Sequence, residues 1–153
     1  MATYVIVGGV AGGATAAARL RRMDESAAII VLERGKYVSF ANCGMPYHIG
    51  GVISQRDALL VSTPAKLAAE FAIDVRTEHE VLRIDREGRA VVVRDMAAGR
   101  TYRQAYDRLI LSPGAKPIVP RIPGADLPGV YALRSMADMD AIKGPVDAGR
   151  VRS

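Results

Sequence analysis

The stretch VIVGGVAGGATAA, residues 5–17, combines the features that decide the fold. Val5–Val7 is a short apolar run of β-branched residues, which is typical of a buried strand. Glycines follow it at once, and from Gly12 to about Asp24 the sequence is rich in alanine, leucine and arginine, which predicts a helix. Ala28–Glu33 predicts a second buried strand. The first 33 residues are therefore expected to form a right-handed strand–helix–strand unit.

The glycine turn matches most of the G-x-G-x-x-G fingerprint of dinucleotide-binding folds. Gly8 and Gly13 stand at its ends, and Val10 replaces the middle glycine. The helix that follows would present backbone N–H groups and its positive dipole end to a pyrophosphate. Glu33 lies 20 residues after Gly13, where a carboxylate can accept both ribose hydroxyls of an adenosine. The alternative is that the glycines only ease packing and that Glu33 is a surface residue.

The remainder of the chain predicts a helix, an antiparallel meander and a return to the first sheet. Pro64–Phe71 follows a Ser-Thr cap and predicts a helix that begins at the proline. The segments EVLRIDREG and RAVVVRD alternate in polarity around a Glu-Gly turn, which with TYRQAYDRLILS indicates a meander. After it we expect a buried strand at Leu109–Leu111, a loop rich in Pro and Gly, a short strand at Val130–Leu133 and a helix at Ser135–Lys143 capped by its serine.

Composition limits the class of protein. The chain has 153 residues, 50% of them hydrophobic and 24% charged, which is enough for one domain with a core. No apolar run approaches the ~18 residues of a membrane span and no leader pattern is present, so we expect no membrane contact and a cytoplasmic protein. The net charge of +5 comes without a run of five basic residues, which argues against nucleic acid as a partner. The two histidines and one cysteine are too widely spaced to suggest a metal site.

The only cysteine, Cys43, lies in the stretch VSFANCGMPYHIGG, residues 38–51. A single cysteine excludes an internal disulfide and is compatible with a reducing compartment. Gly44, Met45 and Pro46 predict the start of a short helix, so Cys43 is expected near a helix N-terminus, a setting that favours a thiolate. The alternative is an inert buried cysteine, the commoner fate of a lone thiol.

These motifs together closely resemble the N-terminal part of the FAD-dependent pyridine nucleotide–disulfide oxidoreductases. The glycine turn, the S-F-x-N-C-G-x-P-Y pattern, YDRLILSPGA and GVYALRSMADMDAIK carry the resemblance. It is strongest to the single-cysteine branch, which comprises coenzyme A disulfide reductases, NADH:persulfide or polysulfide reductases and NADH oxidases. The resemblance implies an α/β fold of three-layer ββα type, in which a Rossmann-like FAD-binding domain with a parallel sheet and helices carries an antiparallel β-meander insertion.

The same resemblance implies a domain organisation. The FAD-binding domain would cover residues 1–150, and the nicotinamide-binding and dimerisation domains would be absent, with the chain ending where the former would begin. The full-length protein would be a homodimer, and this chain alone would bind FAD weakly and be inactive.

The resemblance implies FAD at the glycine turn and NAD(P)H as the electron donor. The FAD pyrophosphate would lie over Gly8–Gly13, the adenosine ribose on Glu33 and the adenine against the backbone of Val81. Ser112–Pro113–Gly114 stands where the family usually has Ala-Thr-Gly, and Pro113 removes one backbone N–H. The residues implied to bind FAD are Gly8, Gly9, Val10, Ala11, Gly12, Gly13, Glu33, Arg34, Val81, Ser112 and Gly114.

The resemblance also makes Cys43 the catalytic residue. With one thiol, Cys43 would hold its oxidised state with a partner from outside the chain, as a mixed disulfide, a persulfide or a sulfenic acid. The expected substrate is a coenzyme A disulfide, a coenzyme A persulfide or a polysulfide. Several coenzyme A disulfide reductases carry a basic residue where this chain has Phe71, which leaves room for a persulfide or polysulfide. The implied substrate-binding residues are Thr15, Arg19, Arg22, Ser39 and Asn42.

Alternatives remain open at this stage. Arg19 and Arg22 share a helix face and Arg21 points elsewhere, but an ordinary solvated face explains the pair as well. The chain could be a non-catalytic module that binds a flavin or nucleotide, or an NADH oxidase that forms a cysteine sulfenic acid. Related peroxidases and oxidases usually have a histidine where Val10 stands, which argues against the latter. The cysteine stretch and the meander argue against an ordinary NAD-dependent dehydrogenase.

Overall fold

The computed structural model describes residues 1–151, which form two compact units. The first unit consists of Met1–Phe40 and Leu60–Gly114, and the second of Ala41–Leu59 and the chain from Ala115 onward. None of the helices in residues 1–151 has both the length and the apolar character needed to cross a membrane.

A four-stranded parallel sheet forms the centre of the first unit, in the order β3-β2-β1-β7. Its strands are β1 (Thr3–Val7), β2 (Ala28–Glu33), β3 (Ile73–Thr77) and β7 (Arg108–Leu111). Val5 and Ile6 are fully buried, as a continuous apolar run in a sheet covered on both faces requires.

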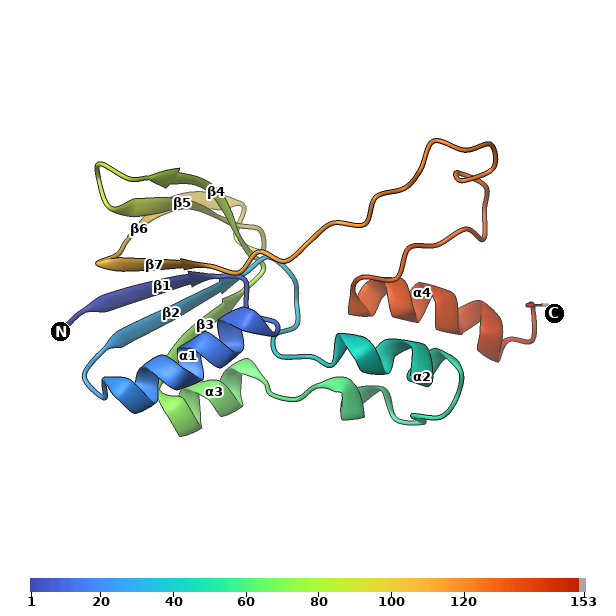
Figure 1. The fold of residues 1–153 in the computed structure, drawn as a ribbon, viewed down its shortest axis with the longest axis horizontal. Coiled ribbons are helices and arrows are strands. Elements are labelled where there is room, and N and C mark those ends of the chain that lie inside the picture. Colours follow the sequence, from blue (N-terminus) through green and yellow to red (C-terminus); the bar gives the residue numbers. More distant parts are fainter. Residues whose placement is uncertain (152–153) are drawn as a thin grey trace. The chain divides into compact units, whose positions relative to one another are not determined.

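Two helices cover one face of this sheet: α1 (Gly12–Met23) and α3 (Pro64–Phe71) (Figure 1). Thr63 caps α3, since its hydroxyl accepts a hydrogen bond from the backbone N–H of Lys66 at 3.2 Å. The apolar layer between helices and sheet includes Ile6, Ala17, Val31 and Leu67.

An antiparallel meander covers the opposite face (Figure 1). It consists of β4 (His79–Asp85), β5 (Ala90–Asp95) and β6 (Arg100–Ala105). Val91 and Val93 of β5 pack against Val5, Ile30 and Leu32 of the parallel sheet. The predicted three-layer arrangement of helices, parallel sheet and meander is therefore confirmed.

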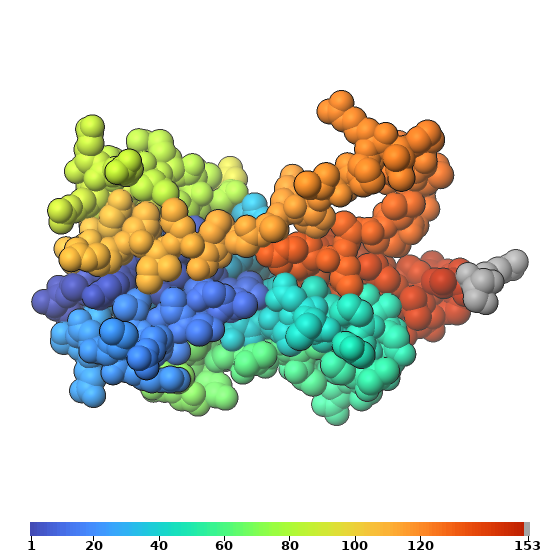
Figure 2. Space-filling view, in the orientation of Figure 1, coloured from blue at the N-terminus to red at the C-terminus, as the bar shows by residue number. Residues whose placement is uncertain are grey.

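The second unit contains short helical segments and α4. They are a 3₁₀ turn at Asn42–Gly44, α2 (Met45–Ile49), a 3₁₀ turn at Arg56–Leu59 and α4 (Met136–Asp147). Two hydrogen bonds of 2.8 Å join the Arg56 guanidinium to the Asp140 carboxylate. This hydrogen bonding is the main reason that the pKa of Asp140 is lowered. The chain before α4 is an irregular coil (Figure 1), and its atoms are orange in Figure 2.

Three details of the prediction are wrong. Val130–Leu133 is not a strand, because its apolar residues find no strand partner and Val130 and Tyr131 are more than half exposed. Helix α4 begins after Ser135 as predicted, but it continues through Gly144 and Pro145 to Asp147. Strand β3 was not predicted, since its alternating sequence IDVRT is short and polar at every second position.

Candidate functional site

The carboxyl ends of the parallel strands bring most of the predicted cofactor-binding residues to one edge of the sheet. The glycine turn follows β1, Glu33 ends β2, and Ser112 follows β7. In open α/β sheets, ligands bind outside this edge.

The glycine turn is built on two close backbone approaches. Gly8 has a φ of +91°, and a Cβ there would lie 2.0 Å from the carbonyl oxygen of Ser112. A Cβ on Gly13 would lie 1.7 Å from the carbonyl oxygen of Gly8. Strand β1, helix α1 and the Ser112 turn can therefore approach this closely only because both positions lack side chains.

Helix α1 begins without a side-chain cap. Ala11 stands at its N-cap and provides no side-chain acceptor, and the first turn contains no acidic residue. The first backbone N–H groups of this 12-residue helix therefore point toward the glycine turn without a carboxylate or hydroxyl of their own segment to satisfy them.

The Glu33 carboxylate lies directly at the glycine turn. One oxygen accepts a hydrogen bond of 2.7 Å from the backbone N–H of Gly9, and the other accepts one of 2.6 Å from Gly35. A carboxylate has about four acceptor sites, so both oxygens can accept further bonds. The structure therefore brings Glu33 and the glycine turn together, at the place that the spacing in the sequence predicted.

The remaining predicted cofactor residues lie on β7's following turn, after β2 and on the meander. Ser112 is close to Gly12, because a Cβ at Gly12 would be 3.2 Å from the Ser112 hydroxyl, and Gly114 has a φ of +72°. The guanidinium of Arg34 is exposed and lies 3.9 Å from the Glu80 carboxylate. Val81 is half-buried on β4 beside an irregularity in the β4–β5 register.

A groove of about 610 Å³ runs between α1 and α3 within the first unit. Four of the five predicted substrate-binding residues line it: Thr15, Arg19 and Arg22 from α1, and Ser39 from the following loop. Val10 and Ala11 of the glycine turn line the same groove. The fifth predicted residue, Asn42, belongs to the second unit together with Cys43.

The arginines of α1 divide into two kinds, as the helix periodicity predicted. The guanidinium of Arg21 donates hydrogen bonds to the carbonyl oxygens of Phe71 at 2.8 Å, Ala72 at 3.0 Å and Glu25 at 2.6 Å. It therefore ties the ends of α1 and α3 together. Arg19 and Arg22 line the groove, and neither makes a hydrogen bond or ion pair within residues 1–151.

Helix α3 adds groove residues that the sequence reasoning missed. Lys66 and Glu70 line the groove from this side, together with Phe71. The available signal was their four-residue spacing, which places Lys66 and Glu70 on one helix face.

Ser39 has an unusual backbone for a residue with a side chain. Its φ is +47°, and its conformation is held by a hydrogen bond of 2.9 Å from its N–H to the Gly9 carbonyl and one of 2.9 Å from Val61 N–H to its own carbonyl. Residues in this region of φ and ψ cost free energy and are concentrated at binding sites.

Cys43 is a free, exposed thiol in the 3₁₀ turn before α2, so it is not a buried cysteine. Helix α2 has five residues, and Gly44 at its N-cap gives no side-chain cap. His48 in the same helix is buried, and its Nδ1 lies 2.7 Å from the Ile53 carbonyl oxygen, which indicates a structural role.

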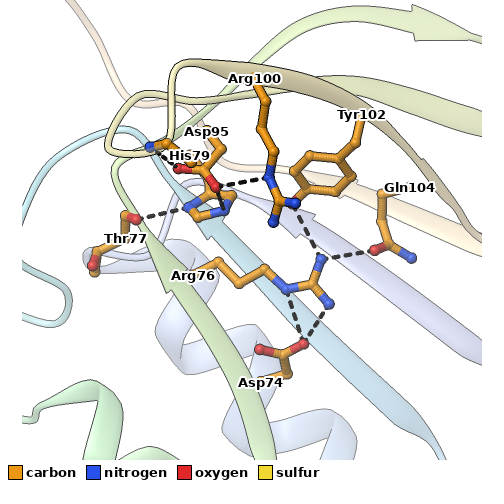
Figure 3. A network of polar contacts seen from close by, with 9 residues as sticks. Asp74, Arg76, Thr77, His79, Asp95, Arg100, Tyr102 and Gln104 are labelled. Atoms are coloured by element: carbon orange, nitrogen blue, oxygen red, sulfur yellow. Dashed lines mark hydrogen bonds and ion pairs between the residues drawn. The ribbon is translucent and has the colours of Figure 1, made fainter.

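A second polar cluster lies between β3 and the meander (Figure 3). The Arg76 guanidinium bonds to the Asp74 carboxylate, the Tyr102 hydroxyl and the Gln104 side-chain oxygen, at 2.6 to 3.1 Å. Asp95 accepts from the backbone of Ala98, which is the main cause of its lowered pKa. The bonds of Arg76 thus connect β3 of the parallel sheet to β6 of the meander.

No group of three or more His, Cys, Asp or Glu side chains within residues 1–151 is arranged to hold a metal ion.

A glycine turn, a helix N-terminus and an acidic residue at the carboxyl edge of a parallel sheet define a dinucleotide-binding type of α/β fold. Within that class, the chain belongs to the pyridine nucleotide–disulphide oxidoreductase family, whose model matches residues 2–151.

Individual members of this family show which of its proteins the chain is similar to. A coenzyme A disulfide reductase of Staphylococcus aureus is 40% identical over 151 residues, which cover 99% of this chain and 34% of the relative. A crystal structure of reduced CoADR-RHD from Bacillus anthracis is similar with 49% identity and a TM-score of 0.93, over 97% of this chain and 27% of that one. An NAD-dependent persulfide reductase from A. fulgidus has 36% identity and a TM-score of 0.90, over 96% and 28%. The chain spans about a third of the length of the curated relatives that it matches.

Proposed function

We propose that this chain is the FAD-binding part of an NAD(P)H-dependent flavoprotein that reduces a coenzyme A disulfide, a coenzyme A persulfide or a polysulfide. The observation that carries the proposal is the pair Arg19 and Arg22, two guanidiniums without a partner in residues 1–151, in a groove that begins at the glycine turn. Unpaired guanidiniums in a groove fit the phosphates of a coenzyme A compound, because arginine binds phosphate through two parallel N–H donors.

The glycine turn supports FAD as the cofactor. The absence of side chains at Gly8 and Gly13 lets β1, the Ser112 turn and the start of α1 pack closely, and α1 would offer a pyrophosphate its uncapped N-terminus. Glu33, whose carboxylate is held by the N–H groups of Gly9 and Gly35, would accept hydrogen bonds from the ribose hydroxyls. When bound, FAD would supply two-electron transfer between NAD(P)H and sulfur.

Cys43 is the proposed site of sulfur chemistry. Its thiolate would attack one sulfur of a coenzyme A disulfide, break the S–S bond, release one coenzyme A thiolate and retain the other half as a mixed disulfide. Two electrons and a proton, supplied from NAD(P)H, would then release the second coenzyme A thiol and restore the Cys43 thiolate.

Glu33→Gln is expected to weaken FAD binding by about tenfold or more, because a hydrogen bond to a charged acceptor contributes ~1.5–3 kcal/mol. Quenching of flavin fluorescence during titration of the chain measures this affinity. Glu87→Gln changes an exposed carboxylate in the β4–β5 turn and is the matched control. Equal FAD affinity in the two variants would contradict the assigned role of Glu33.

Arg19→Ala combined with Arg22→Ala is expected to weaken coenzyme A binding by about tenfold or more, because two charge-assisted bonds to phosphate are lost. Calorimetric titration at two salt concentrations measures the affinity, and its salt dependence should become shallower.

Arg21→Ala is the contrasting variant on the same helix. Since Arg21 bonds to backbone carbonyls and not to the groove, its loss should lower the free energy of unfolding by about 1–2 kcal/mol and leave coenzyme A affinity nearly unchanged. A wild-type chain that does not bind coenzyme A would overturn the proposed substrate class.

A further inference from the structure

Helix α3 contributes charge to the groove in an arrangement that does not serve the helix itself. Lys66 stands in the first turn, where the positive end of the helix dipole disfavours a cation. Glu70 stands in the last turn, where the negative end disfavours an anion. Lysine four residues before glutamate is also the weaker order for an ion pair on a helix. Helix stability therefore does not explain these two residues.

The bond between the two side chains is weak. Lys66 Nζ lies 4.0 Å from Glu70 Oε1, and the side chains are 55% and 51% exposed. Exposed ion pairs at this distance contribute little to the free energy of folding. The ammonium group can therefore leave Glu70 for a more strongly charged anion with little loss of free energy. The backbone N–H of Lys66 donates a hydrogen bond to the Thr63 hydroxyl, while its side chain makes no other polar contact within residues 1–151.

Three positively charged side chains and one carboxylate line the groove. Arg19 and Arg22 line it from α1, and Lys66 and Glu70 line it from α3. Phe71 provides an apolar side chain on the same helix, so Lys66 is the cation that α3 offers to a ligand in the groove.

We propose that Lys66 is a specificity-determining residue that binds a phosphate group of the groove's ligand, and that Glu70 competes with this phosphate for Lys66. The inference rests on the proposed function, since it names a further contact of the same coenzyme A site. Glu70 would disfavour ligands with too little negative charge to displace it, and so select for compounds that carry several phosphate groups.

The proposal predicts effects of opposite sign for two neighbouring residues. Lys66→Ala should weaken coenzyme A binding by about three- to tenfold and make its salt dependence shallower, whereas Lys66→Arg should stay within about twofold of wild type. Glu70→Gln should strengthen binding by about two- to fivefold, because Lys66 is released and a like charge is removed. In the Lys66→Ala background, the gain from Glu70→Gln should shrink.

Calorimetric titration of the purified 153-residue chain with coenzyme A, at low and high salt, tests these effects. Lys116→Ala removes an exposed lysine of the second unit and is the control, and urea unfolding checks that all variants remain equally folded. If the wild-type chain binds coenzyme A and Lys66→Ala binds it equally, the inference about Lys66 is wrong while the proposed function stands. If the wild-type chain does not bind coenzyme A, both fail.

Discussion

Replacing Gly13 with alanine is expected to lower the free energy of unfolding by about 3 kcal/mol or more, the largest effect on stability that we predict. A Cβ at this position would lie 1.7 Å from the carbonyl oxygen of Gly8 and 2.9 Å from its carbonyl carbon. Both atoms are backbone, and Gly8 is itself held by a hydrogen bond of 2.8 Å from its N–H to the Leu32 carbonyl. The collision can therefore be relieved only by moving α1 away from the sheet, which would disrupt the apolar layer between them.

Gly12→Ala is the matched control for Gly13→Ala on the same turn. A Cβ at Gly12 would lie 3.2 Å from the Ser112 hydroxyl, which is a side chain and can rotate away. Alanine is also favoured over glycine in a helix, so this variant should remain within about 1 kcal/mol of wild type. Urea unfolding followed by circular dichroism compares the two. Similar stabilities would show that the close approach at Gly13 is not what holds the turn.

The contrast between these glycines shows what the sequence can predict. Strand β1, the turn and α1 each have a local signal, and their order alone gives the strand–turn–helix unit. Glu33 was found from its spacing to Gly13, because a βαβ unit of standard length places it at the same edge. The sequence does not reveal that Gly13 tolerates no side chain while Gly12 does, since that depends on which atoms of Gly8 and Ser112 face them.

The errors arise where structure depends on distant partners. Strand β3 has a mixed sequence and forms because it pairs in parallel with β2, more than 40 residues earlier in the chain. Val130–Leu133 has strand-like residues but no strand to pair with. Lys66 and Glu70 were not predicted as site residues, because only the groove between α1 and α3 distinguishes their helix face from a solvated one.

Cys43→Ser is expected to abolish the reaction of this chain with coenzyme A disulfide, because Cys43 is the only thiol in its 153 residues. Wild-type chain should form one mixed disulfide per molecule and release one coenzyme A thiol for each. Mass spectrometry of the intact protein and a thiol assay measure the two products independently. If the wild-type chain forms no adduct with coenzyme A disulfide although its thiol is reduced, the proposed step at Cys43 is wrong.

Loss of the thiol would remove any disulfide exchange, so the comparison that tests the groove uses two disulfides of different charge. Wild-type chain should react with coenzyme A disulfide at least about tenfold faster than with a small neutral disulfide such as bis(2-hydroxyethyl) disulfide, since binding raises the local concentration of the former. Arg19→Ala with Arg22→Ala should reduce that advantage and leave the rate with the neutral disulfide unchanged.

Equal rates for both disulfides in wild type would mean that Cys43 reacts as an ordinary exposed thiol. An advantage that survives loss of both arginines would show that Arg19 and Arg22 are not what recognises the coenzyme A group. The two measurements thus separate the reactivity of the sulfur from the recognition of its substrate.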